Sequence, residues 1–225
     1  MTDLLPGPAQ ALVFALAVFV LNATPGVDFL LTVTRTLQGG SRAGVAAVLG
    51  INVGCVVHAL AAAFGLAALL ALHPGAFALI QWAGAGYLVW LGLGLLRQAW
   101  QGGDAGPTAA VSAVSAVPRP WRADFRTGLL TNVLNPKVAL FFLAFLPQFV
   151  PTGSPAKTVS FLLLGAWFVL QSAVFSLALV ALVALAARLS RLQASPTARR
   201  VLLALGGALF IALAARLLGA RVVPV

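Results

Sequence analysis

Long runs of apolar residues dominate the chain and are separated by short polar connections. A helix that crosses a membrane needs about 20 apolar residues. Six segments approach or exceed that length, at residues 9–34, 43–72, 76–96, 125–150, 158–187 and 201–218. The runs lack the alternation of apolar and polar positions that is typical of a β-barrel. The pattern therefore predicts an all-α integral membrane protein with six transmembrane helices.

The composition agrees with a chain embedded in lipid. Of its 225 residues, 61% are apolar and 8% are charged, and the mean hydropathy is +1.04. A soluble domain carries about 25% charged residues. Too little polar surface remains to cover a water-soluble globule, so we expect the lipid bilayer to be its main partner.

The positive charge is unevenly distributed among the connections. The net charge of +10 comes from 14 Lys and Arg against four Asp and Glu. Ten of the basic residues follow the first, third and fifth predicted spans, and three lie on the opposite side. Because basic residues gather in cytoplasmic connections, we expect both termini outside. Their placement in short loops, rather than on one aromatic-lined face, argues against nucleic-acid binding.

One connection, rich in Gly, Ala, Ser and Pro, divides the chain into two halves of three spans. Residues 98–122 form this predicted flexible cytoplasmic linker, between the halves 1–97 and 123–225. Three is an odd number of crossings, so the second half enters the membrane opposite to the first. Both halves place Asn, Pro and a charged residue within their first span. This placement predicts a 3+3 inverted repeat with interrupted helices one and four, as in secondary transporters.

Asp28 and Lys137 are the acid and the base that the sequence places deep within spans. A charge in the middle of a bilayer costs about 2.5–3.5 kcal/mol unless it faces a cavity or a partner. One interpretation is a structural ion pair that joins span one to span four. The other is a binding site for a zwitterion, in which Asp28 engages the ammonium group or an exchanged proton and Lys137 engages the carboxylate.

Two prolines predict the breaks in these spans. Pro25 and Pro136 cannot donate the helical hydrogen bond, which leaves the carbonyls of Leu21 and Asn132 without that donor. The alternative for a lone proline is a simple kink. A new helix beginning at each proline, capped by the preceding residue, would present N–H groups that attract an anion. The candidate substrate-binding residues are Asp28, Lys137, Asn135, Thr24 and Asn132, with Pro25, Gly26 and Pro136 at the breaks.

Other polar or small residues have two interpretations each. Gly50 and Gly54 have the GxxxG spacing of close helix packing, with Asn52 as an interhelical hydrogen-bond donor. Gln171 and Ser172 either line the path or bond to neighbouring helices. Two further side chains of the second span, those of Cys55 and His58, could touch one metal ion. They lack an acid nearby, so we predict no metal site.

Motifs of enzymatic chemistry are missing from the sequence. It contains no GxSxG elbow, HExxH helix, phosphate-binding loop or paired carboxylates. We therefore expect no enzyme and no cofactor, and any uphill transport would have to be driven by an ion gradient.

Two stretches resemble the lysine-exporter (LysE/RhtB) family of bacterial amino-acid exporters. They are ATPGVDFLLTVTRTLQGGSRAGVAAVLGINVG at 23–54 and FRTGLLTNVLNPKVALFFLAFLPQF at 125–149. Span number, spacing and the long central linker extend the resemblance over the chain. The family's Asn-Pro-Lys signature is intact at 135–137. Its Pro-Gly-Pro-Asp signature reads Pro-Gly-Val-Asp at 25–28 and lacks the second proline.

The resemblance implies a secondary transporter of the bacterial inner (plasma) membrane. We also predict a homodimer as one assembly of the chain. The transporter would export amino acids or small derivatives from the cytoplasm by proton antiport. Relatives that export metal cations leave a divalent metal exporter as an alternative, and a membrane-embedded enzyme or an assembly protein as more distant ones. Because no further acid lies within the spans to pair with a cationic side chain, we expect neutral substrates rather than lysine or arginine.

Overall fold

Helices account for all the regular structure that the computed structural model describes. The described residues are 4–66, 119–151 and 154–189, with single positions between 82 and 100 and residue 211. The predicted all-α class is confirmed for these ranges. Two of their helices are long and apolar enough to cross a membrane, or three if one bent pair counts as a single span. Apart from those single positions, predicted spans three and six, the end of predicted span two and nearly all of the linker lie outside the described residues.

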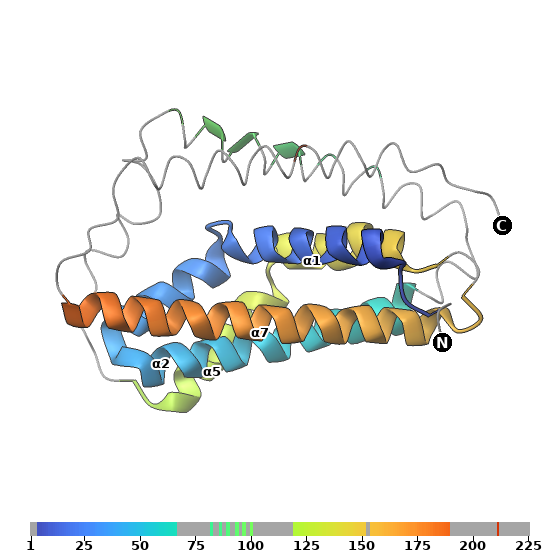
Figure 1. The fold of residues 1–225 in the computed structure, drawn as a ribbon. Coiled ribbons are helices and arrows are strands. Elements are labelled where there is room, and N and C mark those ends of the chain that lie inside the picture. Colours follow the sequence, from blue (N-terminus) through green and yellow to red (C-terminus); the bar gives the residue numbers. More distant parts are fainter. Residues whose placement is uncertain are drawn as a thin grey trace.

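The first predicted span is interrupted where the sequence places its proline. Helix α1 (Pro8–Ala23) ends at Thr24, whose φ of −70° and ψ of 123° are extended, and α2 (Val27–Leu60) begins after Gly26. Within α2, Gly40 adopts φ 72° and ψ −175°, a left-handed conformation that favours glycine. Figure 1 shows the chain changing direction inside α2. The part before Gly40 therefore completes span one, and the part after it forms span two.

The fourth predicted span is interrupted in the same manner. Helix α5 (Trp121–Val133) is followed by α6 (Pro136–Leu140), and the two directions differ by 46° across the break. The π-helix η3 (Phe141–Phe145) and the 3₁₀-helix η4 (Leu146–Phe149) continue from α6. Helix α5 begins at Trp121, four residues before the predicted start of this span at 125. Helix α7 (Lys157–Leu189) matches predicted span five.

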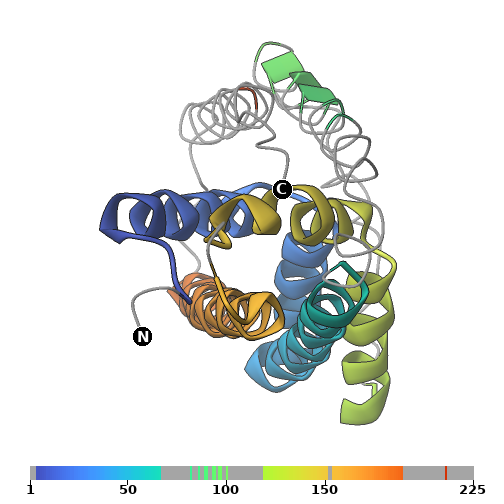
Figure 2. The ribbon, with the colours of Figure 1, turned by 90° about the vertical axis from the view of Figure 1, so that its right-hand side faces the viewer.

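Close backbone contact holds the second span against α5. Helix α2 packs along α5 and α7, while α1 rests on α7 (Figures 1 and 2). A Cβ atom built on Gly50 would collide with the Phe125 carbonyl, and one on Gly128 with the Ala47 carbonyl. The predicted small-residue packing is confirmed. The predicted interhelical bond of Asn52 is wrong, because its amide donates to Val48 O of its own helix at 2.9 Å.

A cluster of buried phenylalanines fills the space beside the second break. Phe14 of α1 lies 5.1 Å from Phe149 between ring centroids, and Phe141 lies 5.2 Å from Phe168 of α7. Tilted aromatic pairs of this kind contribute about 0.5–1.5 kcal/mol each beyond their buried area. The cluster joins α1, the segment after α6 and α7, and so fixes the two broken helices relative to each other.

Candidate functional site

The two helix breaks lie directly against one another, although more than 100 residues separate them in sequence. Lys137 Nζ, from the second break, donates to Leu21 O at 2.9 Å and to Thr24 O at 3.2 Å in the first. In return, Asn135 Nδ2 donates to Asp28 Oδ2 at 2.9 Å. Candidate residues from both breaks, predicted from the sequence alone, therefore meet in one place.

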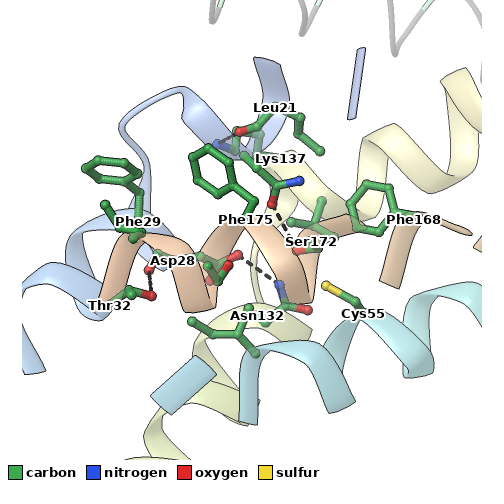
Figure 3. Close-up of a pocket in the computed structure, with 15 residues that line it drawn as sticks. Leu21, Asp28, Phe29, Thr32, Cys55, Asn132, Lys137, Phe168, Ser172 and Phe175 are labelled. Carbon is green, nitrogen blue, oxygen red and sulfur yellow. Dashed lines mark hydrogen bonds between the residues drawn. The ribbon is translucent and has the colours of Figure 1, made fainter. Parts of the chain in front are cut away.

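Asp28 is held by amide groups through one of its oxygen atoms. Its Oδ2 accepts a 2.8 Å bond from Asn132 Nδ2 (Figure 3), in addition to the bond from Asn135 Nδ2. Its Oδ1 is buried and has no hydrogen-bond partner, and the same is true of Asn132 Oδ1. A buried acceptor without a donor costs about 1–3 kcal/mol. The unpartnered Oδ1 of Asp28, which borders a cavity, therefore favours a ligand that donates hydrogen bonds.

Side chains from other helices occupy the carbonyls that the prolines leave without a helical donor. Leu21 O, four residues before Pro25, accepts from the Lys137 ammonium group. Asn132 O, four residues before Pro136, accepts from Asn135 N at 2.9 Å and lies 3.0 Å from His58 Nε2. Because a carbonyl oxygen can only accept, His58 carries its hydrogen on Nε2. No role at this break was predicted for His58, which was considered only as a metal ligand together with Cys55.

The two breaks differ in how their new helices are capped. Asn135 caps α6 as predicted, with Oδ1 accepting from Lys137 N at 3.0 Å and Pro136 at the first helical position. The prediction that Thr24 caps the helix after the first break is wrong, because its hydroxyl donates back to Val20 O of α1 at 2.7 Å. The residue before α2 is Gly26, so Pro25 lies outside that helix. No side chain caps the start of α2.

The family signature explains part of this difference. Val27 occupies the position of the second proline in Pro-Gly-Pro-Asp and is the first residue of α2. The first helical position is where proline is favoured, because its missing N–H has no helical partner there. The helix therefore starts where the family's second proline would start it, rather than at Pro25.

A small cavity lies between the two charged side chains. Its volume is about 30 Å³, and Asp28, Asn132 and Lys137 line it together with aromatic rings such as those of Phe29 and Phe168 (Figure 3). One water molecule needs about 10–15 Å³ on this measure. The cavity therefore has room for water but not for an amino acid.

Lys137 also borders a second and larger cavity. This cavity measures about 870 Å³ and is lined by residues of both breaks, including Gly26 and Asn135, and by Trp90 and Arg97. A Cβ atom on Gly26 would lie 2.9 Å from Lys137 Nζ. The glycine therefore allows the lysine to pass close to the start of α2 and to reach both cavities.

Asp28 and Lys137 do not form an ion pair with each other. Within the described ranges the ion pair is Arg35–Asp124, at 2.7 Å between Arg35 Nη2 and Asp124 Oδ1, with both residues buried. This pair was not predicted from the sequence, because Arg35 follows the predicted end of span one at 34 and Asp124 had no predicted role. Asp124 lies in the first turn of the fourth span, and an acid at that place could have suggested a basic partner.

The remaining polar candidates divide into packing and lining residues. Gln171 Nε2 donates to Ala15 O at 2.7 Å and ties α7 to α1 outside the small cavity. Ser172 donates to Asn22 Oδ1 at 2.9 Å, and both residues line that cavity. Cys55 lines it too, but no group of three or more His, Cys, Asp or Glu that could hold a metal occurs in the part of the chain described.

Comparison with known proteins finds relatives that match most of the chain. The chain is 32% identical over 201 residues to an uncharacterized membrane protein of Vibrio cholerae, covering 89% of this chain and 92% of the relative. It is 28% identical over 202 residues to a homoserine/homoserine lactone efflux protein of Salmonella typhimurium, covering 90% and 92%. It is 29% identical over 148 residues to a leucine efflux protein of Salmonella choleraesuis, covering 66% of each chain. No solved structure matches the chain.

The family match extends over nearly the whole sequence. The model of the LysE type translocator family matches residues 19–221, which include both breaks and the central connection. The relatives are bacterial proteins described as membrane or efflux proteins, in agreement with the predicted membrane localisation. The chain belongs to the LysE type translocator family, and it is a membrane transporter rather than an enzyme.

Proposed function

We propose that this translocator exports neutral amino acids or their small derivatives, and that the substrate binds between the two helix breaks. The observation that carries the proposal is the buried Oδ1 of Asp28, which has no hydrogen-bond partner beside a cavity that Lys137 also lines. An acid and a base at the edges of one cavity suit the two ends of a zwitterion.

The ammonium group of the substrate would bind at Asp28. Its Oδ1 is a buried acceptor without a donor, and an ammonium group supplies three donors. The substrates in the names of the relatives, homoserine, homoserine lactone and leucine, all carry an α-amino group. This shared group makes Asp28 the contact that we expect for every substrate.

The carbonyl end of the substrate would bind at Lys137 and the start of α2. No side chain caps that helix, so its first N–H groups remain available to an oxygen acceptor. Gly26 brings Lys137 Nζ close to the same place. A lactone retains a carbonyl oxygen without a carboxylate charge, and backbone N–H groups can bind either form.

Binding would require the site to open. A cavity of about 30 Å³ holds water only, whereas the cavity of about 870 Å³ on the other side of Lys137 is in the size range of ligand sites. We infer that the described arrangement is an occluded one, in which access changes as the halves 1–97 and 123–225 move as an inverted repeat.

The homodimer stays a prediction.

Proton antiport is the coupling that we propose for the same carboxylate. If Oδ1 of Asp28 takes a proton when the substrate ammonium leaves, the burial of an unpaired charge is avoided in both states. Export of one substrate would then be coupled to entry of one proton, and transport would depend on the pH gradient.

Efflux from proteoliposomes loaded with radiolabelled substrate tests this function. Homoserine, leucine and lysine would be compared under an imposed pH gradient and after an ionophore has dissipated it. We expect gradient-dependent efflux of the neutral amino acids. Efflux of divalent metals alone would contradict the proposal, as would product formation by the solubilised protein without a membrane.

A further inference from the structure

A third cavity lies away from the helix breaks, where the part of α2 near Gly40 meets the start of α5. Its volume is about 410 Å³, and its lining includes three arginines, one aspartate and Trp121. None of these residues lines the cavity between Asp28 and Lys137. The sequence predicts that this end of the molecule faces the cytoplasm.

The cavity carries an excess of positive charge. Arg35 and Asp124 neutralise one another through their buried 2.7 Å ion pair. Arg42 and Arg119 are exposed, and neither has an ion-pair or hydrogen-bond partner among the described residues. Within the described ranges, two guanidinium groups therefore remain without a counter-charge at the rim.

Buried donors inside the cavity lack acceptors. Arg35 Nε and Gln38 Nε2 are both buried without a hydrogen-bond partner, although Arg35 Nη1 donates to Gln38 Oε1 at 2.7 Å. A buried donor left in this state costs about 1–3 kcal/mol. A ligand with several acceptor oxygens would remove that cost.

We propose that this cavity binds a phosphate group, and that the source of the group is the headgroup of an anionic phospholipid. Guanidinium groups match the oxygens of a phosphate through paired hydrogen bonds. The rim would supply Arg42 and Arg119, and the interior would supply Arg35 Nε. Trp121, which is 38% exposed and stacks on Phe125 at 5.6 Å, has the amphipathic character of residues at a membrane–water interface.

The headgroup would join two segments that are distant in sequence. Arg42 follows the kink at Gly40, and Arg119 precedes α5. A phosphate held by both would bridge the same two segments that the Arg35–Asp124 pair already joins. We therefore expect the lipid to stabilise the fold at this end without entering the substrate site.

Thermal unfolding of the purified full-length protein, titrated with lipid in detergent, tests the proposal. The probes are short-chain phosphatidylglycerol, phosphatidylcholine of equal chain length, and inorganic phosphate against chloride at equal ionic strength. The test variant is Arg42→Gln with Arg119→Gln. The matched control, Arg122→Gln with Arg126→Gln, removes the same charge from exposed positions of α5 that do not line the cavity.

We expect phosphatidylglycerol to raise the unfolding midpoint and the test variant to weaken its apparent affinity about tenfold, the effect of losing about 1.4 kcal/mol. The control should change the affinity less than about twofold, as expected for exposed charges. Equal losses in both variants, or equal stabilisation by phosphatidylcholine, would show diffuse attraction and overturn the proposal. Stabilisation by inorganic phosphate alone would confirm phosphate recognition but refute the lipid source.

A lysine variant covers the case in which the glutamine variant fails to fold. Arg42→Lys with Arg119→Lys keeps both charges but loses the paired geometry of guanidinium. Weakened phosphatidylglycerol binding by this folded variant supports the site. Binding equal to that of the unmodified protein contradicts it.

Discussion

Lys137 donates a 2.9 Å hydrogen bond from its ammonium group to the carbonyl oxygen of Leu21, which lies four residues before Pro25. Pro25 cannot supply the helical donor for that carbonyl. The break in one helix thus creates the acceptor that holds the buried charge of the other. This relationship explains how the ammonium group is accommodated without an ion pair to Asp28, and it leaves one oxygen of Asp28 available.

Replacement of Lys137 by alanine should abolish export while the protein remains in the membrane. The substitution removes both hydrogen bonds to the first break and the cation proposed for the carbonyl end of the substrate. Loss of charged hydrogen bonds costs about 1.5–3 kcal/mol each, so expression and monodispersity must be measured beside efflux. Lys157→Ala, at the exposed start of α7, is the matched control and should transport normally. Full efflux by a well-expressed Lys137→Ala protein would refute the site.

Two substitutions at Asp28 should separate its structural role from its transport role. In Asp28→Asn, the side-chain oxygen can still accept from Asn132 and Asn135, so the unfolding free energy should fall by less than about 1 kcal/mol. Without a carboxylate, export should fall at least about tenfold, a barrier change of about 1.4 kcal/mol. Asp28→Leu orphans both amides and should destabilise by about 2–6 kcal/mol. Export by Asp28→Asn at the normal rate would exclude Asp28 as the ammonium or proton site.

The helix breaks and the central charges could be predicted from sequence because their causes are local. A proline removes one hydrogen bond wherever it stands, and an isolated charge in an apolar run needs a partner. Asn135 caps its helix for the same local reason. Thr24 failed as a cap because the start of α2 depends on Gly26 and Val27 as well as on Pro25.

The partners of these groups could not be predicted, because they depend on contacts across the fold. Nothing near His58 in the sequence points to the carbonyl of Asn132, which is 74 residues away. The pairing of Arg35 with Asp124 likewise requires the kink at Gly40 and the packing of α2 on α5. The direct pairing of Asp28 with Lys137 appeared plausible only because neither the amides nor the carbonyls had been placed.

Gly54 should tolerate alanine poorly, because Asn132 fills the space beside it. A Cβ atom there would lie 2.5 Å from Asn132 Oδ1, and moving that amide would disturb Asp28. Overpacking of this kind destabilises by about 1–3 kcal/mol. Gly65→Ala is the control, because nothing lies within 4 Å of a Cβ atom at that position. Unfolding midpoints and efflux should both fall for Gly54→Ala and hold for Gly65→Ala; equal behaviour of the two would contradict the packing argument.

His58 should act by positioning Asn132 rather than by binding metal. Its Nε2 lies 3.0 Å from the Asn132 carbonyl oxygen and donates a hydrogen bond to it. A glutamine amide can supply that donor in part. We expect His58→Gln to retain most export and His58→Leu to lose stability by about 1 kcal/mol, the net value of one hydrogen bond. Efflux of His58→Gln should also be insensitive to EDTA. If His58→Gln fails as completely as His58→Leu while remaining folded, a positioning role is excluded.

Reversal of the two central charges distinguishes a substrate site from a structural ion pair most sharply. In the double variant Asp28→Lys with Lys137→Asp, the new aspartate would face the carbonyl oxygens of Leu21 and Thr24, which repel it. The new lysine would face the amide groups of Asn132 and Asn135, which at present donate to a carboxylate.

Neither new charge keeps a partner, so the double variant should be no more stable than its single variants and should not export. A double-mutant cycle of unfolding free energies, with efflux measured on each folded variant, provides the comparison. A simple ion pair would instead show recovery in the double variant, because removing one partner of a buried pair costs about 3–5 kcal/mol that reversal restores. Such recovery would mean that Asp28 and Lys137 recognise each other, and the carbonyls and amides around them would then have no part in holding the charges.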